Sequence, residues 1–327
     1  MSVAMATYQG AAFIGEQLGS IASQTRPPDE LAISDDGSTD STLEIAERFA
    51  STVPFPVRIY RNEDNLGFSR NFERAISEAN GDVVFLSDQD DIWFPEKIER
   101  VMLEFDKDPD VLAVIHDQRI LDDETGEIFS RSYFDNQRAL GLAEKELVSG
   151  NFTAIRRQLI EILQPFPSGV SYDFWISRVA TALDCRRVVR EPLQLYRRHS
   201  SNLSQPVLAR RRPTLLAELV RIALRDPRPH WREMLALHRS AAKRIGERAG
   251  AIDRRLGKGR ANDSLEILSR QIRSLERRIE MTSLPAFRRR IEILRAWKNG
   301  FYDQFSGARS AAKDMLQPSF DPQWPKE

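Results

Sequence analysis

The sequence predicts an α/β protein with a mostly parallel sheet, helices on both faces of that sheet, and a C-terminal α-helical region. Short apolar segments alternate with helical patterns from residue 3 to residue 115, and the strand signal ends near residue 206. The charges divide at the same place, because residues 1–205 hold 21 Lys/Arg and 34 Asp/Glu, whereas residues 206–327 hold 27 and 14. We therefore expect an acidic α/β domain over residues 1–205 and a basic α-helical region over residues 206–327.

The expected elements alternate along the first domain. Strands are expected at residues 3–6, 31–33, 57–60, 82–86 and 111–115. Helices are expected at residues 13–23, 41–50, 68–79 and 95–105, with Asp40 or Ser41 before the second and Pro95 opening the fourth. Because crossovers between parallel strands are right-handed, this alternation favours a parallel sheet that is covered on both faces.

The composition describes a globular protein. Of the 327 residues, 41% are hydrophobic and 29% are charged, which excludes the disordered and fibrous classes. Cys185 is the only cysteine, so no intrachain disulfide can form and a reducing compartment is favoured. No apolar run approaches the ~18 residues of a membrane span, and no secretory leader is visible. We expect a cytoplasmic protein, either free or peripheral at the inner face of the cell membrane.

An acidic stretch after the fourth expected strand is the centre of the predicted site. The apolar residues 83–86 lead into Asp88, Asp90 and Asp91. Like charges this close repel one another unless a cation lies between them. Carboxylate oxygens suit Mg²⁺ or Mn²⁺, which bind one or two protein carboxylates and complete their coordination with water and substrate phosphate. The stretch therefore predicts a metal–diphosphate site, with a structural acidic turn as the alternative.

Two further loops follow expected strands and carry side chains that suit a nucleotide. Tyr8 offers an aromatic ring on which a nucleobase can stack. Asp35 and Asp36 can accept hydrogen bonds from base N–H groups or ribose hydroxyls. The alternative for residues 35–40 is a turn that caps the next helix. Because functional loops gather at the carboxyl ends of parallel strands, we expect the three loops to face one crevice.

A series of motifs then carries a family resemblance. In order, they are Thr7-Tyr8-Gln9-Gly10, Glu16, Gln24-Thr25, Asp35-Asp36-Gly37-Ser38-Thr39-Asp40, Asn65-Leu66-Gly67 and Asp88-Gln89-Asp90-Asp91-Ile92-Trp93. Their order and spacing resemble glycosyltransferase family 2 with the GT-A fold, over residues 1–205. The resemblance implies a nucleoside-diphosphate sugar donor, a divalent cation and inversion at the anomeric carbon.

The resemblance also implies roles for the matched residues. In the nucleotide-sugar site, Tyr8 and Asp36 contact the base, Asp88 meets the ribose and Glu16 shapes the pocket, with Thr7 and Asp35 beside them. Asp90 binds the Mn²⁺ or Mg²⁺ ion that bridges the diphosphate. Asp91 supports that metal site or contacts the donor sugar.

The second half of the domain supplies the remaining predicted groups. Gly150 resembles the glycine of a family segment that lines the donor and acceptor pocket, and packing explains a glycine equally well. Asp173 resembles the family's general base, which opens a helix and deprotonates the acceptor hydroxyl; service as an N-cap is the alternative. Tyr196-Arg197-Arg198-His199 resembles the family's closing motif. There His199 completes the metal shell or donates to the diphosphate, and Arg197 or Arg198 neutralises phosphate charge, unless His199 is a plain surface residue.

The C-terminal region carries helix periods without strand signals. Helices are expected at residues 213–224, 231–248 and 265–279 and again after residue 285, with a linker at residues 257–260 and an irregular tail from residue 317. Arginine-rich helices with apolar stripes suit an appendage that packs on the catalytic domain or on a second copy as a homo-oligomer. They also suit a platform on an anionic membrane. No nucleic-acid-reading motif accompanies the charge, so we expect no nucleic acid partner.

The combined interpretation is a metal-dependent inverting glycosyltransferase. It is expected to move a sugar from a nucleoside-diphosphate donor to a hydroxyl of a glycan or lipid-linked acceptor in cell-surface polysaccharide biosynthesis. Tyr172-Asp173-Phe174-Trp175 resembles a rhamnosyltransferase-like branch, which favours dTDP-rhamnose as the donor. One alternative is a sugar nucleotidyltransferase, whose Gly-rich, cationic phosphate loop is missing from residues 7–13. The other is a non-catalytic scaffold that binds a nucleotide sugar within a polysaccharide assembly.

Overall fold

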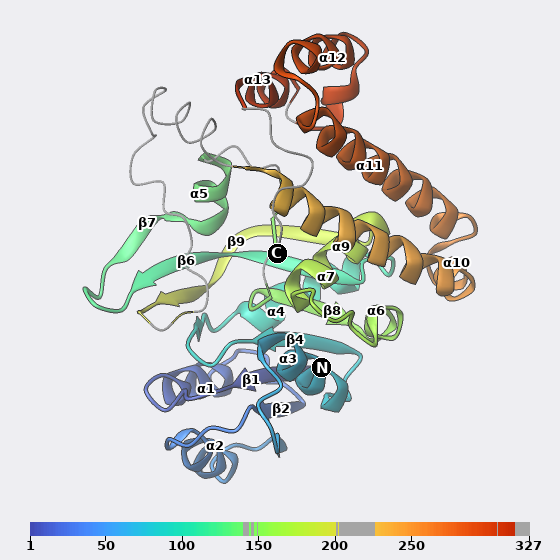
Figure 1. The fold of residues 1–327 in the computed structure, drawn as a ribbon. Coiled ribbons are helices and arrows are strands. Elements are labelled where there is room, and N and C mark those ends of the chain that lie inside the picture. The colour runs from blue at the N-terminus through green and yellow to red at the C-terminus, as the bar shows by residue number, and fades with distance from the viewer. Residues whose placement is uncertain are drawn as a thin grey trace. The chain divides into compact units, whose positions relative to one another are not determined.

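The computed structural model describes residues 1–139, 144, 147–148, 150–200, 202, 226–305 and 307–317 (Figure 1). The chain divides into two compact units. Unit 1 comprises Met1–Ala209 and Arg244–Asn262, and unit 2 comprises Arg210–Lys243 and Asp263–Glu327. The helix expected at residues 213–224 lies outside the described residues, as does the tail beyond residue 317.

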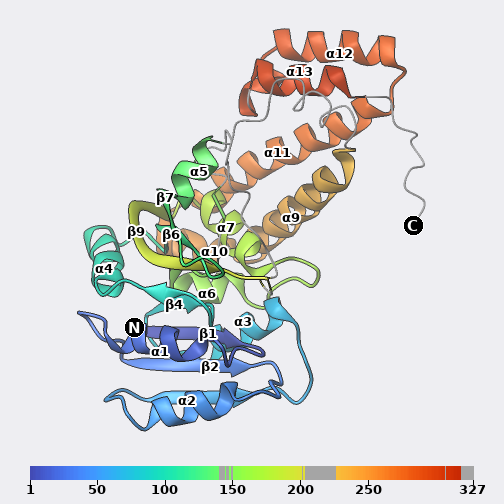
Figure 2. The same ribbon diagram turned by 90° about the vertical axis from the view of Figure 1, so that its left-hand side faces the viewer.

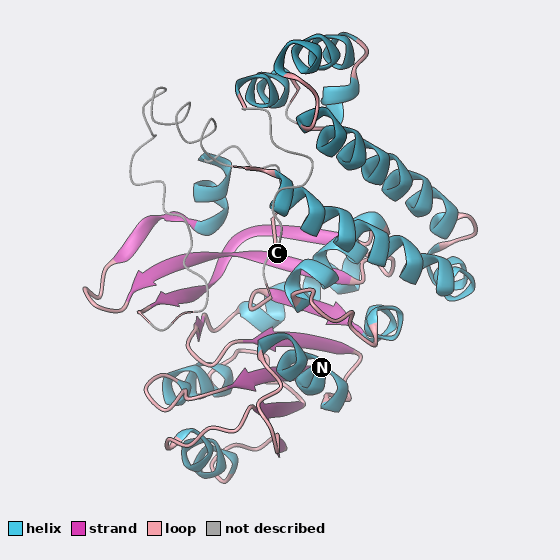
Figure 3. Cartoon of the chain, in the orientation of Figure 1, coloured by secondary structure: helices cyan, strands magenta, loops and turns pink. Residues whose placement is uncertain are grey.

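The first half of unit 1 has the predicted alternation of strands and helices (Figure 3). Strands β1 (Ser2–Thr7), β2 (Glu30–Asp35), β3 (Val57–Arg61) and β4 (Val83–Ser87) pair in parallel in the order β3-β2-β1-β4. The helices are α1 (Ile14–Ala22), α2 (Thr42–Ala50), α3 (Phe68–Glu78) and α4 (Lys97–Lys107). The prediction that Pro95 opens the fourth helix is wrong by two residues, because residues 95–96 form a turn and Glu96 is the N-cap.

The second half of the sheet is mixed in direction. β8 (Thr153–Arg156) runs antiparallel between β4 and β6 (Ala113–Asp122), while β9 (Arg186–Arg198) runs parallel to β6. β5 (Ile92–Trp93) pairs antiparallel with β9, and β7 (Ile128–Ser132) forms a hairpin with β6. The full order is β3-β2-β1-β4-β8-β6-β9-β5, with β7 on β6. The predicted fold class is confirmed. The antiparallel strands were not predicted, because an apolar run shows that a strand is buried but does not show its direction.

The packing of the core explains why the parallel strands appear in the sequence as continuous apolar runs. Val3, Ala4 and Met5 of β1 are fully buried, since β1 is a central strand and helices such as α1 and α3 pack on the faces of the sheet. The core cluster adds Ile14 and Leu18 from α1. Unit 1 also contains α5 (Tyr133–Ala139), α6 (Arg157–Leu163) and α7 (Tyr172–Ala182). With both sides of β1 covered, its polar neighbours are confined to the strand ends, where the loops of interest begin.

Residues 244–262 are part of the first unit although they follow the expected boundary at residue 205. They comprise the end of α9 (Arg228–Glu247), α10 (Ala249–Leu256) and the start of α11 (Arg260–Thr282). Ile245 and Ile252 are fully buried, and Arg244 donates hydrogen bonds to the carbonyls of Leu163 (2.5 Å) and Pro165 (2.7 Å). The division of the chain at residue 205 stays a prediction. Residues 244–262 do not follow it, because they lie beyond residue 205 and belong to unit 1.

Unit 2 is helical, as the periods in its sequence indicate. Besides parts of α9 and α11, it contains α12 (Ala286–Lys298), the 3-10 helix η2 (Phe301–Gln304) and α13 (Ala308–Leu316), and Figure 2 shows α12 and α13 side by side. Arg278 forms a buried two-point ion pair with Asp314 (3.0 and 2.7 Å), which also accepts from the Tyr302 hydroxyl (2.8 Å). Within the described ranges, no helix has both the length and the apolar character to cross a bilayer.

Candidate active site

A cavity of about 840 Å³ lies where β1, β2 and β4 end. Its lining includes the three loops that were expected to face one crevice, together with segments from the second half of the sheet. The predicted site residues that line it are Thr7, Tyr8, Asp36, Asp88, Asp90, Gly150, Asp173 and His199. Five other predicted residues lie outside its lining: Glu16, Asp35, Asp91, Arg197 and Arg198. The volume falls within the range of ~300–1,000 Å³ that is common for small-molecule sites.

Asp35 turns inward and holds its own loop. It is fully buried, and its Oδ1 accepts hydrogen bonds from Thr7 Oγ1 (2.9 Å) and Ser38 Oγ (2.6 Å). Its Oδ2 accepts from the backbone N–H groups of Ser38 (2.8 Å) and Gly37 (3.2 Å). Protein donors therefore occupy both oxygens. The contact with the nucleotide that the resemblance implied for Asp35 stays a prediction.

Asp36 links two loops at the edge of the cavity. Its Oδ1 accepts from Asn62 Nδ2 (2.8 Å) and from the backbone N–H of Leu66 (2.7 Å), and its Oδ2 accepts from the backbone N–H of Gly67 (2.9 Å). Gly67 has a φ of 79°, a backbone conformation that glycine adopts without steric cost. The Asn65-Leu66-Gly67 motif is thus positioned by the same carboxylate that was predicted to contact a base.

Gln89 fixes the loop that carries Tyr8. The Tyr8 backbone N–H donates to Gln89 Oε1, and Gln89 Nε2 donates to the Tyr8 carbonyl, both at 2.9 Å. A Cβ on Gly10 would lie 2.1 Å from the same Oε1, so only glycine fits beside this side chain. The Tyr8 ring itself is 51% exposed. Sequence analysis assigned no role to Gln89, and its place between Asp88 and Asp90 was the only available signal.

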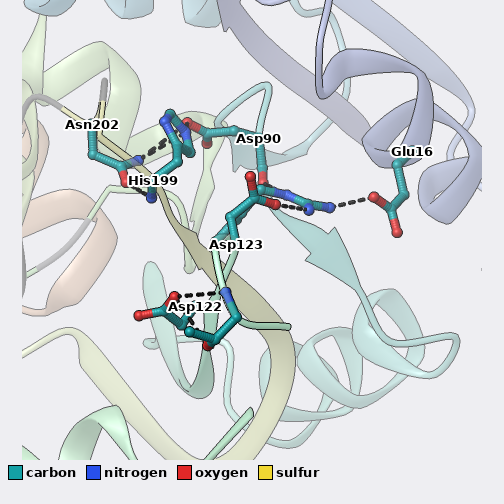
Figure 4. A network of polar contacts seen from close by, with 8 residues as sticks. Glu16, Asp90, Asp122, Asp123, His199 and Asn202 are labelled. Carbon is teal, nitrogen blue, oxygen red and sulfur yellow. Dashed lines mark hydrogen bonds and ion pairs between the residues drawn. The ribbon is translucent and has the colours of Figure 1, made fainter. Parts of the chain in front are cut away.

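Asp90 and His199 are brought together from opposite ends of the domain. His199 Nε2 lies 3.0 Å from Asp90 Oδ2, and Asn202 Nδ2 lies 3.4 Å from the same oxygen (Figure 4). The Phe13 ring stacks on the imidazole with 4.3 Å between centroids, which fixes its plane. Both the Asp90 and His199 side chains are largely buried, at 14% and 10% exposure. Asn202 is a further member of this group that the sequence did not single out.

The spacing of this pair fits a hard divalent cation. Two ligands in adjacent octahedral positions, each about 2.1 Å from Mg²⁺, stand about 3.0 Å apart. Among the described residues, no cluster of three or more His, Cys, Asp or Glu side chains is placed to hold a metal. Asp90 and His199 can therefore supply two ligands, and the remaining positions suit phosphate oxygens and water.

Arg197 donates hydrogen bonds to three protein acceptors, one of which is the backbone carbonyl of Asp90. Its Nε donates to the Asp90 carbonyl (3.0 Å), Nη1 donates to Asp123 (2.7 Å) and Nη2 donates to Glu16. Burial alone would lower the pKa of Arg197, but the hydrogen bonds to Asp123 and Glu16 raise it above its usual value. The guanidinium and Glu16 thus act as supports for the acidic loop in this structure.

Asp91 and Lys97 form a buried polar layer behind the cavity. Asp91 is fully buried, and its Oδ2 accepts from Asn151 Nδ2 (2.5 Å) and Gln194 Nε2 (3.0 Å), while no hydrogen bond from a described residue reaches its Oδ1. Burial, and then the charge of Asp90, raises the pKa of Asp91 to about 8. The Lys97 ammonium donates to Gln194 Oε1 (2.5 Å) and lies 3.6 Å from the centre of the Trp93 ring. Sequence analysis gave Lys97 no role.

Asp88 is a second carboxylate whose pKa is changed by burial and by its neighbours. It lines the cavity, and burial, followed by the charges of Asp90, Asp91 and Asp173, raises its pKa well above the ordinary value. Burial lowers the pKa of Lys97 well below its usual value, although the charges of Asp91 and Asp88 oppose this change. A concentration of carboxyl groups with one buried amine is the electrostatic setting in which an added cation is strongly attracted.

Asp173 is the second residue of α7, so the N-cap alternative is wrong: the N-cap is Ser171. Asp173 Oδ1 accepts from Ser171 Oγ and from the Phe174 backbone N–H (2.8 Å), and no described residue donates a recorded hydrogen bond to its Oδ2. The carboxylate thus has one anchored oxygen and one available to a ligand. A cavity-lining carboxylate held in this way can accept a proton from a bound hydroxyl group.

Gly150 is explained by packing against an aromatic wall of the cavity. A Cβ at this position would lie 1.6 Å from the Tyr172 hydroxyl oxygen. Tyr172 is buried, stacks on Phe72 with 4.1 Å between centroids, and meets Phe68 edge-on at 5.0 Å. Phe68 and Phe174, both lining the cavity, are 40% and 44% exposed. The cavity therefore has an acidic side and an aromatic side that meet at Asp173.

The mixed α/β sheet and the acidic loop after β4 define an α/β domain of the GT-A class. Residues 2–163 match the model of Glycosyl transferase family 2. The chain belongs to this family through that domain, and the family expected from the sequence is confirmed. The chain has 28% identity over 215 residues to an uncharacterised glycosyltransferase from Nostoc sp., covering 62% of this chain and 66% of that protein.

Two further similar proteins have names or titles that mention a nucleotide or a nucleotide sugar. The dTDP-rhamnosyl transferase RfbG of Shigella flexneri is 41% identical over 102 residues, covering 30% of this chain and 35% of that protein. The chain thus spans about one third to two thirds of the length of these curated relatives. A mannosyltransferase from Pyrobaculum calidifontis, solved with GDP-Man and Mn²⁺, is 18% identical, with a TM-score of 0.50 over 100% of this chain and 87% of that one. This likeness concerns the fold alone.

Proposed function

We propose that the chain is a metal-dependent inverting glycosyltransferase that moves a sugar from a nucleoside diphosphate to a hydroxyl of a glycan or lipid-linked acceptor, in cell-surface polysaccharide biosynthesis. The observation that carries this proposal is one cavity that is lined by Tyr8, Asp36, Asp90 and Asp173 from four separate segments. The relative named as a dTDP-rhamnosyl transferase supports dTDP-rhamnose as the donor.

The donor occupies the acidic side of the cavity. The half-exposed Tyr8 ring offers a face for the base, and Gln89 holds the backbone of that residue in place. Asp88 faces the ribose. Asp90 and His199 would hold Mn²⁺ or Mg²⁺, which when bound would supply Lewis-acid stabilisation of the charge on the diphosphate. Arg197 and Gln194 keep the backbone and side chains of residues 90–91 in position behind it.

The acceptor occupies the aromatic side, next to Asp173. Ser171 and the Phe174 N–H orient the carboxylate, and its second oxygen takes the proton of the acceptor hydroxyl as the new bond forms. A positioned base of this kind contributes ~10²–10⁴-fold in rate. Attack from this side, opposite the diphosphate, inverts the anomeric carbon in a single displacement. The exposed rings of Phe68 and Phe174 suit the apolar face of an acceptor sugar.

The test combines donor binding with slow donor hydrolysis, in which water replaces the acceptor. A panel of nucleotide sugars with Mn²⁺ is expected to raise the melting temperature for one donor, because a ligand that binds the folded state stabilises it. Asp173→Asn should keep that shift and lower hydrolysis by about 10²–10⁴-fold. Asp90→Asn should lose both, whereas Asp106→Asn, a control exposed on α4, should lose neither.

Three results would count against the proposal. Full hydrolysis by Asp173→Asn removes Asp173 from the base role. Undiminished hydrolysis in excess EDTA removes the metal. A donor that binds without turnover in any condition favours the scaffold alternative.

A further inference from the structure

Helix α12 in unit 2 has one buried side and one exposed apolar side. Arg289, Ile293 and Ala296 are 2%, 1% and 0% exposed. Ile293 and Ala296 belong to a core cluster with Tyr302 and Ala311, so this side anchors the helix within its own unit. The opposite side carries Phe287, Leu294 and Trp297, which are 75%, 42% and 44% exposed. The core of unit 2 does not require these three side chains.

The three exposed side chains share a face because of their spacing. Positions 287, 294 and 297 are seven and three residues apart, which places them on one side of a helix with 3.6 residues per turn. The same turns carry Arg288, Arg290, Arg295 and Lys298, all exposed. Glu292 is the only acidic residue of the helix, and Arg295 pairs with it at 2.7 Å. We call this surface the α12 face, defined by Phe287, Leu294, Trp297, Arg290 and Lys298.

We propose that the α12 face binds the surface of an anionic lipid bilayer. An interfacial helix buries aromatic and aliphatic side chains at the level of the headgroups, while arginine and lysine side chains reach the lipid phosphates. Helices of this kind need not be long, and α12 has 13 residues. The inference does not depend on the proposed transferase activity.

The charge of the chain favours this partner. Residues 206–327 hold 27 Lys/Arg against 14 Asp/Glu, whereas residues 1–205 hold 21 against 34. An anionic surface therefore attracts the region that carries the α12 face and repels the domain that carries the cavity. A second copy is a poorer partner, because a twofold contact through this face would bring Arg290 and Lys298 close to their own symmetry mates.

The first experiment is flotation of the full chain with vesicles of phosphatidylcholine, alone or mixed with phosphatidylglycerol. Binding is expected only to the anionic vesicles and should weaken with salt. Arg290→Gln together with Lys298→Gln should weaken binding about 30-fold, since each cation near such a surface contributes about five-fold. Phe287→Ser together with Trp297→Ser should weaken it by at least about tenfold. Ile267→Ser is the matched control, because Ile267 on α11 is 42% exposed and lies off the face.

The second experiment reports where the membrane touches the chain. Cys185 is buried, and burial raises the pKa of its thiol to about 12, so a maleimide fluorophore should label an introduced cysteine selectively. A polarity-sensitive label at Phe287→Cys should shift to the blue with anionic vesicles. The same label at Ile267→Cys should not shift.

Each contrary outcome has a definite meaning. If the α12 variants float as well as the parent chain while circular dichroism shows them folded, the proposal is wrong. It is equally wrong if Ile267→Ser lowers binding as much as the α12 variants do. If those variants change the oligomeric state by light scattering and leave flotation unchanged, the face joins copies of this chain. If short RNA shifts the label at position 287 and anionic vesicles do not, the face binds nucleic acid instead.

Discussion

Replacing Arg197 with methionine tests whether this residue positions the acidic loop or binds phosphate. Methionine keeps much of the packing against Phe13, over which the guanidinium lies at 5.4 Å, but removes the three donated hydrogen bonds. Hydrogen bonds to charged groups contribute ~1.5–3 kcal/mol each. Glu16 and Asp123 are 58% and 32% exposed, so their contributions are screened. We expect a loss of about 3 kcal/mol in the free energy of unfolding.

The assay is urea unfolding combined with Mn²⁺ titration. A loss of about 3 kcal/mol corresponds to a fall of roughly 6–12 °C in melting temperature for a domain of this size. Releasing the Asp90 backbone should also weaken Mn²⁺ binding by about 10–100-fold, as the loss of groups that support metal ligands does. Arg187→Met is the control, because Arg187 is on the same strand with a single ion pair to Asp108 (3.0 Å).

The positioning argument fails if Arg197→Met unfolds within about 0.5 kcal/mol of the control while donor affinity falls steeply. That result would restore the interpretation from family resemblance, in which the arginine neutralises the diphosphate.

Two further predictions concern stability. The raised pKa of Asp91, about 8, means that between pH 4 and pH 8 the folded chain holds a proton that the unfolded chain releases. In EDTA, stability should therefore fall as the pH rises through this window, by about 1.4 kcal/mol per pH unit. Asp91→Asn should flatten the fall when melts at pH 5 and pH 8 are compared, and an unchanged slope would contradict this. Arg244→Met should lower the free energy of unfolding by about 2 kcal/mol, because Arg244 donates hydrogen bonds to three carbonyls at and beyond the end of α6. The control is Arg248→Met, since Arg248 is exposed. Equal urea midpoints for the two variants would contradict the expectation.

Much of the fold and of the site composition was predictable because both follow from local pattern. Apolar runs and helix periods located β1 to β4 and the helices between them, and the rule that the carboxyl ends of parallel strands share one edge of the sheet placed Tyr8, Asp36 and Asp90 together. The short strands β5 and β8 were not predicted, because a segment of two to four residues is too short to show a hydrophobic period. Their antiparallel pairing depends on partners that lie far away in the sequence.

The orientation of the side chains was not predictable. Asp35 and Asp36 are neighbours of the same type, yet one accepts hydrogen bonds from its own loop and from Thr7 of β1, and the other joins a second loop at the cavity. Gln89 and Lys97 gain their importance from contacts with the Tyr8 backbone and with Gln194, 81 and 97 positions away along the chain. No local pattern encodes such contacts.

By itself, the sequence determined the class of domain, the positions of β1 to β4 along the chain and the loops that carry the chemistry, because hydrophobic periodicity and residue type are local properties. Only the tertiary structure decided which carboxylates line the cavity, that Arg197 supports Asp90 from below, and that residues 244–262 pack as part of unit 1. These outcomes depend on which distant groups satisfy each buried charge and hydrogen bond, and the folded chain alone brings those groups together.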